Sequence, residues 1–124
     1  DMQSELLQNG YAVLSDLDYE PGSSKLGSGP FRSLKELADF MENQPAAEII
    51  LVGHTDNTGA IDANITLSKR RAASVVERLV AKYGIAAKRI TAQGVGFLAP
   101  LTANTDKSGR EQNRRVEAVI RRLQ

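Results

Sequence analysis

The chain has 124 residues, a net charge of +1, 41% hydrophobic and 25% charged residues, and no cysteine. This length predicts one domain, and the composition is that of a folded globular chain rather than a disordered one. The absence of cysteine excludes disulfides and thiolate metal sites. No apolar run approaches the ~18 residues that span a bilayer. Because the sequence opens at Asp1 without a signal peptide, we expect a processed or excised segment that lacks any targeting or anchoring element.

Charge is unevenly distributed along the chain. Residues 1–62 carry 3 Lys/Arg and 11 Asp/Glu, a net of −8, whereas residues 63–124 carry 13 and 4, a net of +9. Such asymmetry indicates either a polyanion-binding surface or two halves that attract each other within one fold. Because only 5% of the residues are aromatic, platforms for base stacking are few. We therefore favour two complementary halves and expect no nucleic-acid partner.

The first third of the chain predicts a lead-in, a strand and a loop. Residues 1–10 are expected to be a helical or frayed lead-in to a domain that covers residues 11–124. The stretch "YAVLSDLDY" (Tyr11–Tyr19) has β-type residues with partial alternation and predicts a strand. The next stretch, Glu20–Pro30, is rich in Gly, Ser and Pro and predicts a loop.

A helix and a buried strand follow this loop. In "PFRSLKELADFMENQ" apolar residues recur at helical spacing, so we expect a helix with Pro30 in its first turn and Ser28 or Gly29 as its cap. Pro45 is expected to end it. The nearly continuous apolar run from Ala47 to His54 predicts a central strand that is buried on both faces.

The second half predicts one long helix and two strands. An apolar stripe from about Thr66 to Tyr83 indicates an amphipathic helix that ends at Gly84. Residues 89–96 predict a short strand, and the alternation within residues 113–123 predicts another, reached by a polar connection without a helix. The order β-α-β-α-β-β predicts an α/β fold with a partly parallel, mixed sheet, an antiparallel last strand and both helices on one face.

Charged side chains are predicted to gather beyond the carboxyl ends of the parallel strands. Asp56 follows the buried strand, and the loop at residues 20–24 follows the first strand. On the long helix, Arg70 lies opposite the apolar stripe, whereas Arg71 lies on its flank and is able to reach toward Asp56. Asp56 and Arg71 either pair with each other or hold a zwitterionic ligand, the carboxylate taking an ammonium and the guanidinium taking a carboxylate.

His54 is the only histidine and suggests three roles. A metal site is disfavoured, because His54 and Asp56 supply only two ligands and open zinc sites need three from the protein. A serine-histidine-aspartate site is disfavoured because no Gly-x-Ser-x-Gly elbow occurs. We therefore expect a structural role, a hydrogen bond that anchors the loop at the strand end, and we expect no catalytic residue, metal or cofactor.

Four blocks of sequence follow one another along the chain: "GHTDNTG", "NITLSKRRAASV", "RITAQGVG" and "GREQNRRVEAVI". In this order they resemble the OmpA-like domains of bacterial outer-membrane proteins, Pal lipoproteins and flagellar stator subunits, and the resemblance covers Asp16 to Ile120. It implies an OmpA-like β-α-β-α-β-β sandwich and non-covalent binding of peptidoglycan without catalysis. It also implies a periplasmic domain of an outer-membrane or other envelope protein, membrane-anchored as a whole, with a further protein partner or a homodimer left open.

The resemblance also implies which residues touch the ligand. Asp56 and Arg71 fall on the family positions that grip the free amino-acid end of diaminopimelate in the stem peptide. The remaining expected ligand-binding residues are Thr58, Asn64, Leu67, Arg114, Gly22 and Ser23. The wall formed by Gly22 and Ser23 lies in "DLDYEPGSS", where this chain departs from the commoner pattern. Two alternatives remain at this point: a small hydrolase that uses His54 and Asp56, and a polyanion-binding domain that uses the basic second half.

Overall fold

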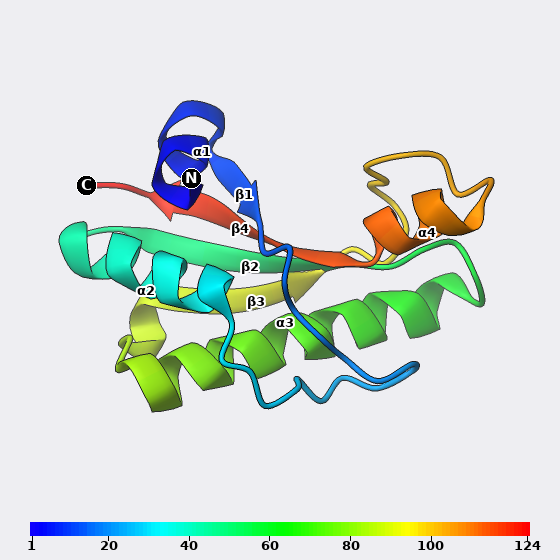
Figure 1. Cartoon of the computed structure of the whole chain (residues 1–124), viewed down its shortest axis with the longest axis horizontal. Coiled ribbons are helices and arrows are strands. Elements are labelled where there is room, and N and C mark those ends of the chain that lie inside the picture. The colour runs from blue at the N-terminus through cyan, green and yellow to red at the C-terminus, as the bar shows by residue number, and fades with distance from the viewer.

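A four-stranded mixed sheet in the order β1-β4-β2-β3 organises the computed structural model, which describes all 124 residues (Figure 1). The elements follow in this order: α1 (Met2–Asn9), β1 (Tyr11–Val13), α2 (Arg32–Asn43), β2 (Glu48–His54), α3 (Ile61–Tyr83), the 3₁₀-helix η1 (Ala87–Arg89), β3 (Ile90–Gly94), α4 (Lys107–Asn113) and β4 (Arg115–Arg122). The predicted α/β class with a mixed sheet is confirmed.

The strand directions are those that the element order predicts. Strands β2 and β3 are parallel, as expected for strands joined through a helix. Strand β4 lies between β1 and β2 and is antiparallel to both, so the prediction for the last strand is confirmed. Its register places Arg115 opposite His54 at one end of β2, and Arg122 opposite Glu48 at the other.

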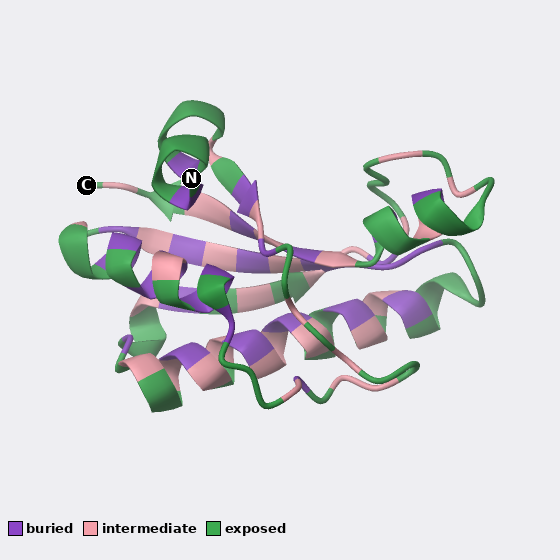
Figure 2. Ribbon diagram, viewed as in Figure 1, coloured by how far each residue is buried: buried purple, intermediate pink, exposed green.

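One face of the sheet carries the apolar core beneath the helices. Helices α1, α2 and α3 lie side by side over it, and Figure 2 shows buried residues on their inner sides and along the central strands. The largest fully buried side chains include Phe40, Leu37, Leu51 and Leu79. Strand β2 is central, but the prediction that both of its faces are buried is wrong: residues on the helix side are buried, and Ile50 and Val52 on the other face are only half-buried.

Helix α1 occupies most of the segment expected to be a lead-in. The Asp1 carboxylate accepts a hydrogen bond from the Ser4 N–H at 2.8 Å, which caps the first turn. Gly10, at φ 81°, ends the helix in the left-handed conformation. Met2 and Leu6 are buried and belong to the same core as the other helices, so this segment is helical rather than frayed.

The first strand and the second helix differ from their predicted bounds. Strand β1 ends at Val13 instead of Tyr19, because the chain then leaves the sheet and crosses α3 (Figure 1). Helix α2 begins at Arg32, so Pro30 lies before the helix and neither predicted residue caps it. A distant carboxylate serves instead: Asp16 accepts from the Ser33 N–H at 3.1 Å and from the Ser33 hydroxyl.

Helix α3 is longer than predicted, and α4 is an additional helix. The buried positions in the first turns of α3 are the polar residues Asn64 and Ser68, so the start of this helix at Ile61 carries no apolar periodic signal. The prediction that β4 follows a connection without a helix is wrong. Asp106 caps α4 by accepting from the Gly109 N–H at 2.7 Å, and this short polar helix leads directly into β4.

Close contact between α3 and the sheet fixes where the functional side chains lie. A Cβ atom at Gly53 in β2 would overlap the Ser68 carbonyl oxygen of α3, and one at Gly94 in β3 would overlap the Lys69 nitrogen. The Ser68 hydroxyl also accepts a hydrogen bond from the Gly96 N–H at 3.0 Å. Glycines therefore let the helix backbone rest against the carboxyl ends of both parallel strands.

No helix in the chain has the length and apolarity that a membrane span requires.

Candidate functional site

Asp56 lies just beyond the end of β2, and its carboxylate contacts the Thr58 N–H and the Arg114 guanidinium. Its Oδ1 accepts from the Thr58 N–H at 2.8 Å, and its Oδ2 forms an ion pair with Nη1 of Arg114. Burial opposes ionisation, but the Thr58 N–H and the Arg114 guanidinium outweigh it and lower the pKa of Asp56 below its ordinary value of 3.8. Asn64 donates to the Thr58 carbonyl at 2.9 Å and so braces the same turn from α3. Asp56 is therefore an ionised, fixed acceptor at the sheet edge.

Arg71 reaches from α3 to the loop that follows β1. Its Nε donates to the Ser23 carbonyl at 2.8 Å, and its guanidinium lies over the Tyr19 ring, 5.1 Å from the ring centre. Its two terminal nitrogens donate no hydrogen bond within the protein and form no ion pair. Burial lowers the pKa of Arg71, and the nearby Arg114 adds to this effect while Tyr19 and Asp56 oppose it. The planar end of this cation is thus partly desolvated and able to donate hydrogen bonds to another molecule.

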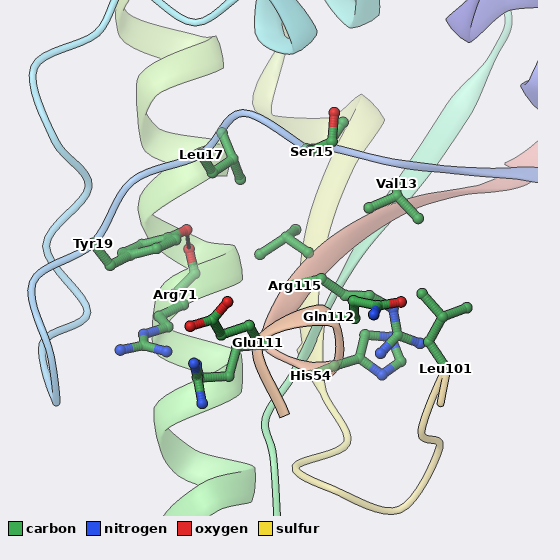
Figure 3. A pocket seen from close by; sticks show the side chains of 13 residues that line it. Val13, Ser15, Leu17, Tyr19, His54, Arg71, Leu101, Glu111, Gln112 and Arg115 are labelled. Carbon is green, nitrogen blue, oxygen red and sulfur yellow. Dashed lines mark hydrogen bonds between the residues drawn. The ribbon is translucent and has the colours of Figure 1, made fainter. Parts of the chain in front are cut away.

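Tyr19 is a residue of the site that sequence reasoning did not identify. Its hydroxyl donates to the Arg71 carbonyl at 2.8 Å, and Figure 3 shows its ring beside the Arg71 side chain. Burial raises the pKa of Tyr19, although the nearby Arg71 and Arg78 favour the ionised form. The sequence offered only one hint, an aromatic residue in the loop beside the predicted site.

Two further hydrogen bonds hold the loop of residues 20–30 on α3. The Ser74 hydroxyl donates to the Ser24 carbonyl at 2.6 Å, and Arg78 Nη2 donates to the Gly27 carbonyl at 2.9 Å. Within the loop, Gly22 has φ 71°, a conformation that favours glycine. These bonds place the Ser23 carbonyl where it orients Arg71.

Two hollows lie beside α3, and only the second is lined by Arg71. A cleft of about 410 Å³ is lined by Gly22 and Leu67 among others, between the loop and the first turns of α3. A cavity of about 310 Å³ lies between α3 and α4 and is lined by Arg71 and Arg114 (Figure 3). The eight predicted ligand-binding residues therefore lie in one region: Asp56, Thr58, Asn64 and Arg114 are linked by direct contacts, Arg71 bonds Ser23, and Gly22 and Leu67 line the adjoining cleft.

His54 is buried at the end of β2, with 6% of its surface exposed. The predicted loop-anchoring hydrogen bond is absent, and neither ring nitrogen has a hydrogen-bond partner. The Glu117 Oε1 atom lies 3.4 Å from Nε2 without hydrogen-bond geometry, and the other Glu117 oxygen accepts from Arg115 Nε at 2.7 Å. Burial opposes ionisation of Glu117, but the His54 ring and the Arg115 guanidinium outweigh it and lower its pKa.

The chemistry required by the hydrolase alternative is not assembled around His54. No serine hydroxyl bonds to the ring, and no three His, Asp or Glu side chains gather as a metal site would require. The sequence had disfavoured both arrangements on residue types alone. The neighbours of the ring are instead the strand residues Arg115 and Glu117.

Asn113 positions Arg114 by fixing the loop before it. Its side-chain oxygen accepts from the N–H groups of Leu101 and Thr102 at 2.8 and 3.0 Å. Its side-chain nitrogen donates to the Thr102 carbonyl and to Asn104 Oδ1, both at 2.8 Å. Because Asn113 is fully buried and satisfied by four bonds, the start of β4 is held in place.

Several basic residues of the second half meet carboxylates of the first. Arg114 pairs with Asp56, while Arg121 and Arg122 approach Glu48 at 3.9 and 3.5 Å. Arg115 pairs with Glu117 within β4. The uneven charge of the sequence is thus partly neutralised inside one fold, as predicted for complementary halves.

The OmpA family model matches residues 19–114 of this chain. The chain is 38% identical over 108 residues to outer membrane porin F of Pseudomonas aeruginosa, a match that covers 87% of this chain and 31% of that protein. It is 40% identical over 90 residues to the peptidoglycan-binding protein ArfA of Mycobacterium tuberculosis, which covers 73% of this chain and 27% of that protein.

A solved structure has the same fold. The peptidoglycan-associated lipoprotein of Burkholderia pseudomallei superposes with a TM-score of 0.74 at 24% identity, over 98% of this chain and all of that one. This likeness concerns the fold alone. The chain spans about a third of the length of the first curated relatives, 31% of one porin F and 32% of another.

Proposed function

Because the chain belongs to the OmpA family, we propose that it binds peptidoglycan non-covalently and thereby tethers an envelope protein to the cell wall. The observation that carries this proposal is that the terminal nitrogens of Arg71, which donate no hydrogen bond within the protein, lie near the ionised Asp56. A cation and an anion fixed at one edge of a sheet suit a ligand with both charges on one carbon. The free amino-acid end of diaminopimelate, in the stem peptide of the wall, is such a ligand.

Arg71 is proposed to take the carboxylate of this group. A guanidinium presents two parallel N–H donors that match the two carboxylate oxygens. The Nε bond to Ser23 and the Tyr19 ring hold this plane in one orientation, so little side-chain freedom remains to be lost on binding. Partial burial strengthens the attraction, because screening by water is weaker there.

Asp56 is proposed to take the ammonium. One of its oxygens accepts a hydrogen bond from the Thr58 N–H, and the other pairs with Arg114. The Arg114 side chain is 39% exposed. An incoming ammonium therefore shares or replaces the Arg114 contact, and a displaced Arg114 remains beside the ligand carboxylate. Thr58, Asn64, Gly22, Ser23 and Leu67 are proposed to shape the rest of the pocket.

The tethering role concerns the protein to which this domain belongs. The chain covers only about a third of relatives such as porin F, so an anchored remainder is part of the proposal. Relatives include outer membrane proteins and a lipoprotein, which supports a periplasmic domain of a cell-envelope protein. Weak binding at one site is sufficient for such a role, because the wall is a polymer that many copies contact at once.

The two alternatives have less support. A hydrolase requires an activated nucleophile or a metal-bound water, and the contacts of His54 provide neither. A polyanion-binding surface requires unpaired basic side chains, but in the arginine cluster on and beside β4, Arg114, Arg115 and Arg122 each contact a carboxylate. The relatives include porins, a lipoprotein and a peptidoglycan-binding protein.

Calorimetric titration with a diaminopimelate-containing stem peptide tests the proposal. We expect binding by the unchanged chain and a loss of thirtyfold or more for Asp56→Ala and for Arg71→Ala, since about 2 to 5 kcal/mol is lost when one partner of a buried charge pair is removed. A stem peptide with lysine in place of diaminopimelate lacks the carboxylate and is expected to bind weakly.

Lys69→Ala is the matched control, because it removes an exposed cation from the same helix two residues before Arg71. Its affinity is expected to equal that of the unchanged chain. Equal affinities for the lysine and diaminopimelate peptides, or equal losses for Lys69→Ala and Arg71→Ala, would contradict a site that recognises the zwitterion.

A further inference from the structure

We propose that Arg114 determines which ligands Asp56 accepts, because Arg114 has to leave Asp56 before a ligand ammonium binds there. This inference rests on the proposed function and adds a selection step to it. In the free protein the Arg114 guanidinium pairs with the Asp56 carboxylate, in the place that the ligand ammonium is proposed to take. Only a ligand that also carries a carboxylate offers the displaced guanidinium a new anion. Arg114 therefore excludes ligands that carry an ammonium alone.

The Asp56 carboxylate has little room for an additional cation. Its Oδ1 accepts from the Thr58 N–H at 2.8 Å, its Oδ2 is paired with Arg114, and its side chain is only 12% exposed. The Thr58 N–H belongs to the backbone of a turn that Asn64 braces from α3, so this donor stays in place. An ammonium that binds Asp56 therefore displaces Arg114.

Arg114 combines a fixed backbone with a side chain that is free to move. Its backbone N–H donates to the Arg110 carbonyl at 3.2 Å, and the preceding Asn113 is fully buried with four side-chain hydrogen bonds. The Arg114 side chain, in contrast, is 39% exposed and donates to Asp56 alone. The next side chain, that of Arg115, is 8% exposed and donates three hydrogen bonds. The Arg114 guanidinium is therefore able to leave by rotation of its own side chain, whereas that of Arg115 is held.

The charges around Asp56 make an ammonium alone a poor replacement for Arg114. Burial lowers the pKa of Arg71, and the charge of the nearby Arg114 lowers it further, so the two guanidinium groups repel each other. An ammonium alone would bring another positive charge into this partly buried region and leave the displaced Arg114 without an anion beside Arg71. Such a ligand forms one ion pair and breaks another, so its net gain is small.

A carboxylate on the same carbon as the ammonium changes this balance. It gives one anion to the terminal nitrogens of Arg71 and to the displaced Arg114, whose mutual repulsion is thereby reduced. Glu111 is the only carboxylate that lines the cavity together with Arg114 (Figure 3), and it is exposed, so a pair between these two side chains would contribute little. The ammonium and the carboxylate of the ligand are therefore recognised together rather than by two independent contacts.

Arg114→Met tests the proposal, because it keeps an unbranched side chain and removes the cation. NMR titrations use two stem peptides that differ only in carrying diaminopimelate or lysine, which has the ammonium without the carboxylate. We expect Arg114→Met to bind the lysine peptide about tenfold more tightly than the unchanged chain does, since no guanidinium has to be displaced from Asp56. Affinity for the diaminopimelate peptide is expected to change less than about threefold, because the loss of the competitor offsets the loss of a contact to the ligand carboxylate.

Arg110→Met is the matched control, because it removes a cation from α4 four residues before Arg114. The Arg110 side chain donates only to the Asn104 carbonyl, at 3.4 Å, so both peptides are expected to bind this variant within about twofold of the unchanged chain. Arg114→Lys keeps a cation for Asp56 and is expected to keep the weak binding of the lysine peptide. A gain of affinity in Arg114→Met cannot come from loss of structure, since unfolding would weaken binding of both peptides.

The outcomes separate the two proposals. The unchanged chain sustains the proposed function if it binds the diaminopimelate peptide and prefers it to the lysine peptide. If Arg114→Met then binds the lysine peptide no more tightly than the unchanged chain, or if Arg110→Met gains as much, Arg114 does not select the ligand while the proposed function stands. If the unchanged chain binds neither peptide, or binds both equally, the proposed function fails and this inference fails with it.

Discussion

Two arginines lie near opposite ends of β2 and donate hydrogen bonds to backbone carbonyls, but they donate different numbers of them. Arg89, beside the start of β2, donates three hydrogen bonds: to Ala47 at 3.1 Å, and to Met41 and Gln44 at 2.7 Å each. Arg71, near the end of β2, donates one, to Ser23 at 2.8 Å. Both arginines are half-buried, but the Arg89 guanidinium donates three hydrogen bonds and the Arg71 guanidinium donates one.

The difference indicates where the protein is built for stability and where it is built for binding. Arg89 ties the end of α2 to the start of β2, and its bonds satisfy carbonyls that the helix end leaves without partners. Arg71 keeps its planar end unpaired although partial burial makes this costly. A desolvated cation without a partner is expected where a ligand supplies the missing anion.

The largest effect on stability is expected from Arg89→Ala. The substitution leaves the carbonyls of Met41, Gln44 and Ala47 without their donor, and we expect a loss of about 2–4 kcal/mol in the free energy of unfolding. Urea denaturation measures this loss. Affinity for the stem peptide, measured where the variant is folded, is expected to stay within about twofold.

Arg71→Ala is the matched comparison, since it removes the same side chain from the other end of β2. Only one hydrogen bond and one ring contact are lost, so a loss of about 1 kcal/mol in unfolding free energy is expected. Equal losses for Arg71→Ala and Arg89→Ala would mean that the two guanidinium groups serve stability alike, and the comparison would fail.

A smaller effect is expected from Tyr19→Leu. The ring beneath Arg71 is lost, so the guanidinium is held less firmly and affinity for the stem peptide is expected to fall about fivefold by calorimetry. Tyr19→Phe keeps the ring and removes only the hydroxyl bond to the Arg71 carbonyl. It is expected to bind within about twofold of the unchanged chain. A Phe variant as weak as the Leu variant would assign the effect to the hydroxyl.

The smallest effect on stability is expected from acid, and it should appear at the end of β2 that carries Asp56. The folded pKa values of Asp56 and Glu117 lie below their ordinary values of 3.8 and 4.5, so the unfolded chain binds more protons as the pH falls. Their contribution to stability is present above these ordinary values and is lost below them. Arg89 bonds only carbonyls, which do not titrate in this range.

Amide hydrogen exchange at about pH 5 and about pH 3 checks this expectation. Protection is expected to fall first in the Asp56 turn and at the start of β4, and later where α2 meets β2. In Asp56→Asn, amide protection in this turn should depend less on pH than in the unchanged chain. Unchanged dependence in that variant would mean that the pKa of Asp56 is not lowered by folding.

The sequence by itself determined the elements that local periodicity encodes. The apolar run at Ala47–His54 and the stripe of α3 predicted the central strand and the long helix, and their order predicted the parallel pair β2–β3 and the antiparallel β4. The helical spacing also placed Arg71 on the side of α3 that reaches the loop after β1, whereas Arg70 lines the adjoining cleft. The strand and the helices depend on contacts between near neighbours, so a linear pattern records them, and the strand directions follow from the order of the elements.

Only the tertiary structure decided the features that depend on distant partners. Asp16 sets the start of α2, Tyr19 orients Arg71, and Arg114 pairs with Asp56 across 58 positions of the chain. The absent hydrogen bond of His54 likewise emerges only when β4 lies beside β2. Contacts of this kind leave no periodic signal, because each joins two residues whose separation in sequence is arbitrary until the sheet has formed.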